Sequence, residues 1–273
     1  MNVAQAVQHG MALGLERLDA QLLVLHVLGR TAHDRAWLMA HDTDVLPPQA
    51  ASMLETLAAR RVAGEPLAYL TGHKEFYGLD LVVDNRVLDP RPDTETLVEW
   101  ALEVLPDEAS ARVIDLGTGS GAIALALKAT RPNLIVVALD YSTDALAVAQ
   151  ANAQRLRLDV HCTQGSWLDS VPGRFTAIVS NPPYIRADDR HLETLTHEPL
   201  QALASGHDGF DDIRHIIAQA PEHLEPGGWL LLEHGYDQAP SVRALLSTAG
   251  FTHVQSRQDL AGIARCSGGR WPA

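Results

Sequence analysis

The chain of 273 residues is long enough to form one or two domains with a buried core. Hydrophobic residues make up 46% of it and charged residues 20%, a composition that is typical of globular proteins and excludes an intrinsically disordered chain. The net charge of −13 at pH 7 repels nucleic acid, and no segment rich in lysine and arginine offsets it.

The two cysteines and thirteen histidines form no recognisable disulfide framework or metal site. Cys162 and Cys266 lie far apart and in no Cys-x-x-Cys pair, so the sequence indicates neither a disulfide scaffold nor a cysteine-bound zinc ion. The histidines are scattered, and no His-Glu-x-x-His motif occurs. We therefore expect no metal cofactor.

The amino-terminal segment and the apolar runs carry no pattern of export or membrane insertion. The first ten residues lack the basic start and sustained apolar core of a signal peptide. The longest apolar runs, such as residues 134–139, fall far short of the ~18 residues that a membrane span needs. We expect a soluble, cytoplasmic protein.

Residues 1–72 have the pattern of a small helical domain. In the segment 16–30, leucines recur at helical spacing and predict one buried face. These leucines are Leu18, Leu22, Leu25 and Leu28. A further helix is predicted over residues 47–64, because prolines stand at its entrance and a glycine ends it.

Residues 73–92 change to a strand-like pattern. Apolar residues alternate over 79–83, a turn is predicted at Asp84–Asn85, and apolar residues resume at Val87 and Leu88. The Pro-Arg-Pro tripeptide that follows excludes a helix and makes a stiff exit. We expect a β-hairpin that links two domains.

From residue 93 to the end, predicted strands and helices alternate. Helices are predicted at 94–105, 120–130, 142–156, 209–224 and 240–249. Strands are predicted at 112–116, 134–140, 159–163, 175–180, 229–235, 251–257 and about 262–266. This alternation predicts an α/β domain over residues 93–273, a doubly wound and mostly parallel sheet with helices on both faces.

A glycine-rich loop stands at the first strand-to-helix turn of the predicted sheet. Its residues are Gly117, Thr118, Gly119, Ser120 and Gly121. The glycines let the backbone approach a ligand closely, and the N–H groups of the following helix attract an anion. Ala122 completes the pattern Gly-x-Gly-x-x-[Gly/Ala]. The pattern alone also fits a tight turn that binds nothing.

Asp140 ends the second predicted strand, 23 residues after Gly117. A carboxylate at this place can accept hydrogen bonds from two ribose hydroxyls, although it can also cap the next helix before Ser142. An adenosine-containing cofactor is therefore indicated. The glycine loop does not distinguish NAD from S-adenosylmethionine (SAM).

The predicted strand 175–180 ends in the sequence Asn-Pro-Pro-Tyr, residues Asn181, Pro182, Pro183 and Tyr184. A planar –NH2 group has two hydrogens, which the Asn181 side-chain oxygen and the Pro182 carbonyl can each accept. The prolines make that carbonyl rigid, and Tyr184 offers a flat face to a planar amide or base. The arrangement suits methyl transfer from SAM to a planar nitrogen, with Asn181 and Pro182 as the catalytic groups. A structural Pro-Pro turn is the alternative.

The chain resembles the HemK/PrmC family of release factor glutamine methyltransferases. The resemblance rests on the segments KEFYGLDLVVD, PRPDTETLVEWAL, DLGTGSGAIAL, GSW, NPPYI, EPLQAL and PGGWLLLEHGYDQ, and it covers residues 16–265. Asp89 departs from the pattern, because the family usually has an apolar residue at this position. With an aspartate there, we expect the end of the hairpin to be more exposed to water. Residues 196–197 also depart, where the family tends to have a basic residue and an aromatic one.

The resemblance implies methylation of the glutamine in the GGQ loop of class-I peptide-chain release factors. It implies that the glycine loop holds the methionine end of SAM, that Asp140 holds the ribose and that Trp167 lines the adenine region. Asn181 would touch both cofactor and glutamine, and the segment 181–184 would hold the glutamine amide. Arg91 and Glu198 are expected near the site.

The same resemblance implies three parts of the chain and one protein partner. Residues 1–72 would bind the release factor, residues 73–92 would form the hairpin linker, and residues 93–273 would form the methyltransferase domain. We expect a monomer that binds neither nucleic acid nor membranes.

Other functions stay open on the residues alone. A nucleic-acid adenine or guanine amino-methyltransferase also uses Asn-Pro-Pro-Tyr motifs, but it needs a positive groove that this acidic sequence lacks. An NAD-dependent oxidoreductase fits the glycine loop, but no Tyr-x-x-x-Lys pair occurs. A binding protein that has lost the chemistry is disfavoured by the intact set of Gly117, Asp140 and Asn181.

Overall fold

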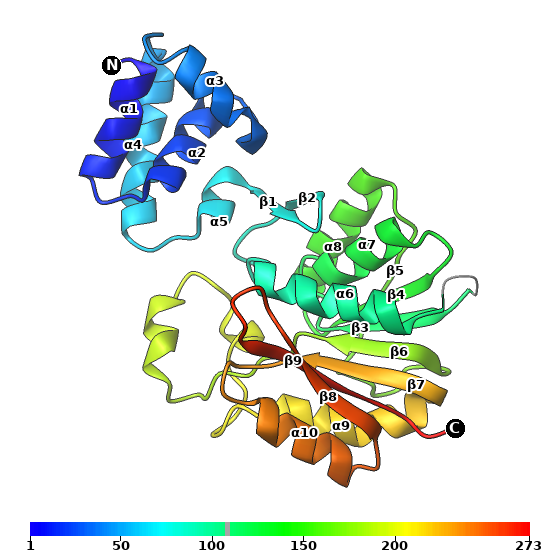
Figure 1. The fold of residues 1–273 in the computed structure, drawn as a ribbon. Helices are drawn as coiled ribbons and strands as arrows, with labels where there is room; N and C mark the ends of the chain where they lie inside the picture. The colour runs from blue at the N-terminus through cyan, green and yellow to red at the C-terminus, as the bar shows by residue number, and fades with distance from the viewer. Residues whose placement is uncertain (107–109) are drawn as a thin grey trace. The chain divides into compact units, whose positions relative to one another are not determined.

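The computed structural model describes residues 1–106 and 110–273, which divide into two compact units (Figure 1). The amino-terminal unit is Met1–His73 and the carboxyl-terminal unit is Lys74–Ala273. Each unit has its own hydrophobic core. No helix among the described residues is long and apolar enough to cross a membrane.

The amino-terminal unit is helical, as predicted. Its helices are α1 (Val3–Ala12), α2 (Arg17–Val27), α3 (Arg35–Ala40), α4 (Pro48–Val62) and α5 (Leu67–Thr71), with a 3-10 turn at Ala32–Asp34. Asn2 begins α1 in a capping box with Gln5, and α4 begins with a proline at its first position.

The buried face of α2 agrees only in part with the predicted leucine stripe. Leu25 is fully buried as predicted, and Leu22 and Leu28 pack against the core, but Leu18 is 46% exposed. The fully buried positions also include Leu23 and Val24, which the stripe leaves out. The stripe was drawn from leucine spacing alone, but the apolar surface of this helix is wider than one line of leucines. The tertiary packing uses the part of that surface centred on Leu23 and Val24.

A two-stranded sheet of β1 (His73–Phe76) and β2 (Leu79–Val82) follows. Tyr77 and Gly78 between them both have positive φ, 50° and 76°. A two-residue hairpin turn of type I′ requires this backbone, and glycine adopts it without strain.

The prediction that the hairpin turns at Asp84–Asn85 is therefore wrong. The turn lies at Tyr77–Gly78, and the described residues 83–91 contain no strand that could pair after Asp84. Asp84 instead closes a local turn, in which its carboxylate accepts hydrogen bonds from the backbone N–H and the guanidinium of Arg86. The hairpin lies one strand earlier in the sequence than predicted.

The carboxyl-terminal unit is a seven-stranded sheet with helices on both faces, so the predicted doubly wound fold is confirmed. The strands are β3 (Arg112–Leu116), β4 (Ile135–Asp140), β5 (His161–Gln164), β6 (Phe175–Ser180), β7 (Leu224–Glu233), β8 (Thr252–Gln258) and β9 (Ala264–Arg270). The helices are α6 (Glu95–Val104), α7 (Ala122–Thr130), α8 (Thr143–Leu156), α9 (Asp211–His223) and α10 (Ala239–Thr248). In Figure 1, α6, α7 and α8 lie on one face and α9 and α10 on the other.

The strand order β5-β4-β3-β6-β7-β9-β8 places the site. Strands β3 to β7 are parallel, and β9 runs antiparallel to both of its neighbours. The chain winds outward from β3 to β5 and then returns to β6 on the other side of β3. Ligands of such sheets bind at the carboxyl ends of the strands where the winding reverses, which here are β3 and β6.

Candidate functional site

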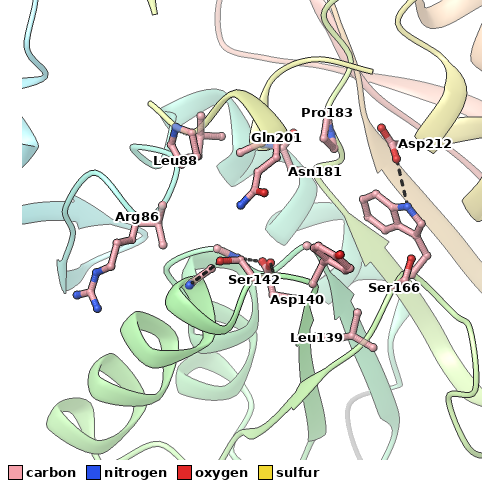
Figure 2. A pocket seen from close by; sticks show the side chains of 18 of the residues that line it. Arg86, Leu88, Leu139, Asp140, Ser142, Ser166, Asn181, Pro183, Gln201 and Asp212 are labelled. Carbon is pink, nitrogen blue, oxygen red and sulfur yellow. Dashed lines mark hydrogen bonds between the residues drawn. The ribbon is translucent and has the colours of Figure 1, made fainter. Parts of the chain in front are cut away.

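A cavity of about 230 Å³ opens at the carboxyl ends of β3, β4 and β6 (Figure 2). The residues that line it come from the strand ends, from the segments that follow them, and from residues 86–88, 199–202, α8 and α9. They are Arg86, Val87, Leu88, Gly117, Gly119, Leu139, Asp140, Tyr141, Ser142, Ala145, Gly165, Ser166, Trp167, Asn181, Pro183, Pro199, Gln201, Ala202 and Asp212. The topology thus brings the glycine loop, Asp140 and Asn181 to one hollow, as the sequence predicts.

The glycine loop forms one wall of the cavity with bare backbone. Gly117 and Gly119 line it, and both have positive φ, 70° and 55°. The N–H groups of Gly117 and Thr118 donate to the Leu139 carbonyl at 2.8 and 2.9 Å, which fastens the loop to the end of β4. A Cβ on Gly117 would come within 3.5 Å of the Trp167 ring, so any side chain there would narrow the cavity.

Three predicted loop residues shape the loop and do not line the cavity. Thr118 is buried and its hydroxyl donates to Asp115 Oδ2 at 2.6 Å. The buried Ser120 offers its carbonyl to the side chain of Asn152 at 3.0 Å, and Gly121 begins α7 with a φ of 86°. Their predicted contact with the cofactor therefore has no support from the shape of the cavity.

Asp115 is a buried carboxyl group directly beneath this loop. Its Oδ2 also accepts the Ala124 N–H at 3.2 Å, while its Oδ1 has no hydrogen-bond partner among the described residues. Burial raises the pKa of Asp115 to about 7, and the two hydrogen bonds only partly oppose this rise.

Asp140 faces the cavity from the end of β4. Its Oδ2 accepts the Gly119 N–H and its Oδ1 accepts the Ser142 N–H, each at 2.9 Å. Each oxygen keeps a second lone pair for a ligand hydroxyl. Burial raises the pKa of Asp140, whereas these backbone donors lower it. The cap of α8 is Ser142, whose side chain accepts the Ala145 N–H, so Asp140 is left to orient the loop and meet a ligand.

Trp167 lines the cavity next to Gly117 of the glycine loop. Its Nε1–H donates to Asp212 Oδ1 at 3.1 Å, the contact drawn as a dashed line in Figure 2. The contact fixes the plane of the indole, whose apolar face, with Leu139 beside it in the lining, suits a flat aromatic ligand.

The Asn-Pro-Pro-Tyr segment begins at the end of β6. Asn181 and Pro183 line the cavity, but Pro182 and Tyr184 do not. The Asn181 Nδ2 donates to Thr94 Oγ1 at 3.3 Å. Within the described part of the chain, neither Asn181 Oδ1 nor the Pro182 carbonyl accepts a hydrogen bond, so both are free for a donor.

Tyr184 is held firmly behind this segment. Its N–H donates to the Leu203 carbonyl at 3.2 Å, and its own carbonyl accepts Gln238 Nε2 at 3.0 Å. Burial and the nearby Glu233 carboxyl both raise the pKa of the Tyr184 phenol, so the phenol stays protonated at neutral pH.

Arg91 and Glu198 lie beside the lining residues and pair with each other. Arg91 donates to Glu198 Oε1 at 2.5 Å, and Glu198 Oε2 accepts the Asp89 N–H at 3.2 Å. Asp89 itself is buried, with Lys74 Nζ at 3.2 Å from its Oδ1 and Arg91 at 3.5 Å from its Oδ2. The expectation that water surrounds Asp89 is therefore wrong, because Lys74 and Arg91 contact its carboxylate in place of water.

Residues 93–255 match the methyltransferase small domain family, and residues 7–72 match the PrmC N-terminal domain family. A release factor glutamine methyltransferase of Bordetella pertussis is 52% identical over 94% of this chain and 95% of its own length. One from Xylella fastidiosa is 48% identical, over 94% of each chain. The chain belongs to the release factor glutamine methyltransferase family.

Solved structures agree on the fold. A methyltransferase from Pyrococcus furiosus matches with a TM-score of 0.58 and 19% identity, over 80% of this chain and all of that chain. An identity this low supports the shared fold alone.

The methyl donor of this methyltransferase is SAM, and the residues of the cavity fit it. The glycine wall leaves room that a Cβ would fill, Asp140 has free acceptor positions for hydroxyls, and the Trp167 ring offers an apolar face.

Several lining residues were not predicted. Tyr141 and Ser142 directly follow Asp140, and Gly165 and Ser166 precede Trp167, so their neighbours in sequence were the available signal. Leu139 directly precedes Asp140, and Ala145 follows it on α8. The remaining ones come from residues 86–88, 199–202 and Asp212, which reach the cavity only through folding. Residues 199–202 lie in the EPLQAL segment that carries the resemblance, whereas no local pattern marks residues 86–88 or Asp212.

Proposed function

We propose that this protein transfers a methyl group from SAM to the side-chain amide nitrogen of the glutamine in the GGQ motif of class-I peptide-chain release factors. The observation that carries the proposal is the pair of free acceptors, Asn181 Oδ1 and the Pro182 carbonyl, at the edge of the cavity that holds the glycine loop and Asp140. The names of its relatives support the same substrate.

Three groups of residues would hold the cofactor. The backbone at Gly117 and Gly119 would cradle the methionine end, Asp140 would accept from the ribose hydroxyls, and Trp167 would pack on the adenine. Bound SAM supplies a methyl group on a positively charged sulfur, and this sulfur leaves readily as a neutral thioether.

The chain's own part in the reaction is to activate and aim the substrate nitrogen. An amide nitrogen is a weak nucleophile because its lone pair is delocalised into the carbonyl. Asn181 Oδ1 and the Pro182 carbonyl would each accept one N–H and so return electron density to nitrogen. The same two contacts direct the lone pair at the methyl carbon, and such positioning can supply up to ~7–11 kcal/mol of the barrier.

The surrounding side chains would complete the amide site. Pro183 lines the cavity and Tyr184 is held behind it, so both would give the planar amide a rigid, apolar surface. The methylated nitrogen is acidic enough to lose its extra proton to water, so the reaction needs no strong base.

The three predicted parts of the chain are proposed with the same roles. Residues 1–72 would bind the release factor, and residues 93–273 would catalyse the methyl transfer. Residues 73–92 would link these two domains. We propose a monomer that works in the cytoplasm, where release factors act, and that binds the protein substrate without binding nucleic acid. The net charge of −13 supports the last point.

The test is methyl transfer from radiolabelled SAM to three acceptors offered separately: a purified class-I release factor, its GGQ→GGA variant, and bulk nucleic acid. We expect label in the unaltered release factor alone. Label in the GGA variant would contradict the acceptor residue. Label in nucleic acid would replace the proposal with an amino-methyltransferase acting on bases.

A further inference from the structure

A buried glutamate lies next to Asn181 and is not part of the proposed chemistry. Glu233 is the last residue of β7 and is only 2% exposed. In the parallel pairing of β6 and β7, Ser180 is opposite Leu232. The residue after Ser180 is Asn181, directly past the end of β6, and the residue after Leu232 is Glu233, so the register sets these two side chains side by side.

Glu233 and Asn181 share a third partner, Thr94, from the 3-10 turn Pro92–Thr94. Thr94 Oγ1 accepts the Asn181 Nδ2 hydrogen at 3.3 Å. Hydrogen bonding by both side chains lowers the pKa of the Glu233 carboxyl, against the larger effect of burial. Glu233 Oε2 has no hydrogen-bond partner in the described part of the chain. The Asn181 amino group thus faces a carboxyl and a hydroxyl.

An ionised carboxylate only accepts hydrogen bonds, so it distinguishes the two ends of an asparagine amide. With Nδ2 toward Glu233, Asn181 leaves Oδ1 for the substrate. A flipped amide would set Oδ1 against the carboxylate and present –NH2 to the substrate –NH2, so that neither could accept. We propose that Glu233 is a positioning residue that holds the Asn181 amide in its accepting orientation. This inference rests on the proposed function.

Protonation would remove this preference, because a neutral carboxyl can donate to Oδ1 of the flipped amide. The charged and titratable groups around Glu233 are Asp93 on the 3-10 turn, Tyr184 after β6, and Arg265 and Cys266 on β9. Burial raises the pKa of Glu233 to about 7, and Asp93 adds to the rise. The orienting carboxylate therefore forms as the pH increases through about 7, and activity should rise with it.

The first experiment compares Glu233→Gln with the wild-type protein in the release factor assay from pH 5.5 to pH 9. Glutamine keeps the size but can donate, so we expect kcat to fall roughly 10- to 100-fold, with the SAM Kd unchanged. The rise of the wild-type rate through pH 7 should disappear. Thr94→Val should also lower kcat, and Thr94→Ser, which keeps the hydroxyl, should restore most of it.

The matched control is Glu225→Gln, at the opposite end of the same strand. Glu225 also accepts from a threonine hydroxyl of β6, that of Thr176, at 3.0 Å. It lies far from the cavity lining, so its rate and pH profile should be those of the wild type. An equal loss in both variants would point to a merely structural role and overturn the inference.

A readout without substrate separates this inference from the proposed function. The Asn181 side-chain amide resonances, assigned by their loss in Asn181→Asp, should shift with a midpoint near pH 7 and stay fixed in Glu233→Gln. If the wild-type protein labels no release factor, the proposed function fails, and the resonances still decide the contact. Resonances that do not titrate, or an unchanged pH profile in Glu233→Gln, would overturn the inference.

Discussion

Two polar side chains face the cavity from different strands, and their partners give them different tasks. Asp140 ends β4, and each of its oxygens accepts a backbone N–H, from Gly119 and from Ser142. The same carboxylate therefore holds the glycine loop in place and can accept hydrogen bonds from a ligand. Asn181 directly follows β6, with its amino group engaged and its oxygen free. The first arrangement suits binding of the cofactor and the second suits activation of the acceptor.

Replacing each residue separately should therefore divide binding from turnover. Asn181→Ala should leave the SAM Kd within about threefold and lower kcat by roughly 100-fold or more, because one aimed acceptor is lost. Asp140→Ala should weaken SAM binding by about 10- to 100-fold, through the loss of charge-assisted hydrogen bonds. Calorimetry and single-turnover rates measure the two effects. Equal losses of binding and turnover in Asn181→Ala would contradict this division.

At the scale of elements, one asparagine joins three segments of the carboxyl-terminal unit. Asn152 on α8 is fully buried and pairs with Val82 of β2 as a strand would, accepting its N–H at 2.8 Å and donating to its carbonyl at 2.9 Å. It also donates to the Ser120 carbonyl in the glycine loop at 3.0 Å. The hairpin, the helix and the loop thus depend on one side chain.

Asn152→Ala should destabilise the protein by about 2–4 kcal/mol, because it leaves buried backbone groups of Val82 and Ser120 unpaired. Urea unfolding measures the free energy of unfolding. Gln154→Ala, an exposed position on the same helix, is the control and should change it by less than about 0.5 kcal/mol. The loss of glycine-loop anchoring should also weaken SAM binding in Asn152→Ala. A loss no larger than that of the control would show that the hairpin and loop do not need these bonds.

At the scale of the whole molecule, two fully buried carboxyl groups link stability to pH. Burial is the main cause that raises the pKa of both Asp115 and Glu233 to about 7. An unfolded aspartate or glutamate titrates near 4, so between about pH 4 and pH 7 the folded protein holds protons that the unfolded chain has released. The free energy of unfolding should therefore fall as the pH rises through this window.

Asp115→Asn tests this link, since asparagine resembles the protonated acid and can still accept from Thr118 and Ala124. At pH 4 the variant and the wild type should be similarly stable. At pH 8 the variant should be more stable, by at most on the order of 4 kcal/mol. Unfolding without cofactor at a series of pH values measures the difference. Parallel pH profiles for the two proteins would show that Asp115 does not cause the loss.

Most elements of the sheet domain could be predicted because their signals are local. The bounds of β3 and β6 agree with the prediction to the residue, since each is a short run of buried apolar residues that ends in a turn motif. The hairpin was misplaced because Tyr77 has a positive φ, which the sequence does not signal for a tyrosine. Of the site, Gly117, Gly119, Asp140, Trp167, Asn181 and Pro183 were predicted and line the cavity.

The sequence by itself determined which strand ends carry polar groups, because glycine loops, caps and Asn-Pro-Pro-Tyr are written in consecutive residues. Only the tertiary structure decided which distant groups meet there. Asp212 reaches Trp167 across 45 positions, and Glu233 reaches Asn181 only because β7 pairs with β6 in one register. Such meetings depend on strand order and register, which arise from the packing of the whole sheet and leave no mark in a local pattern.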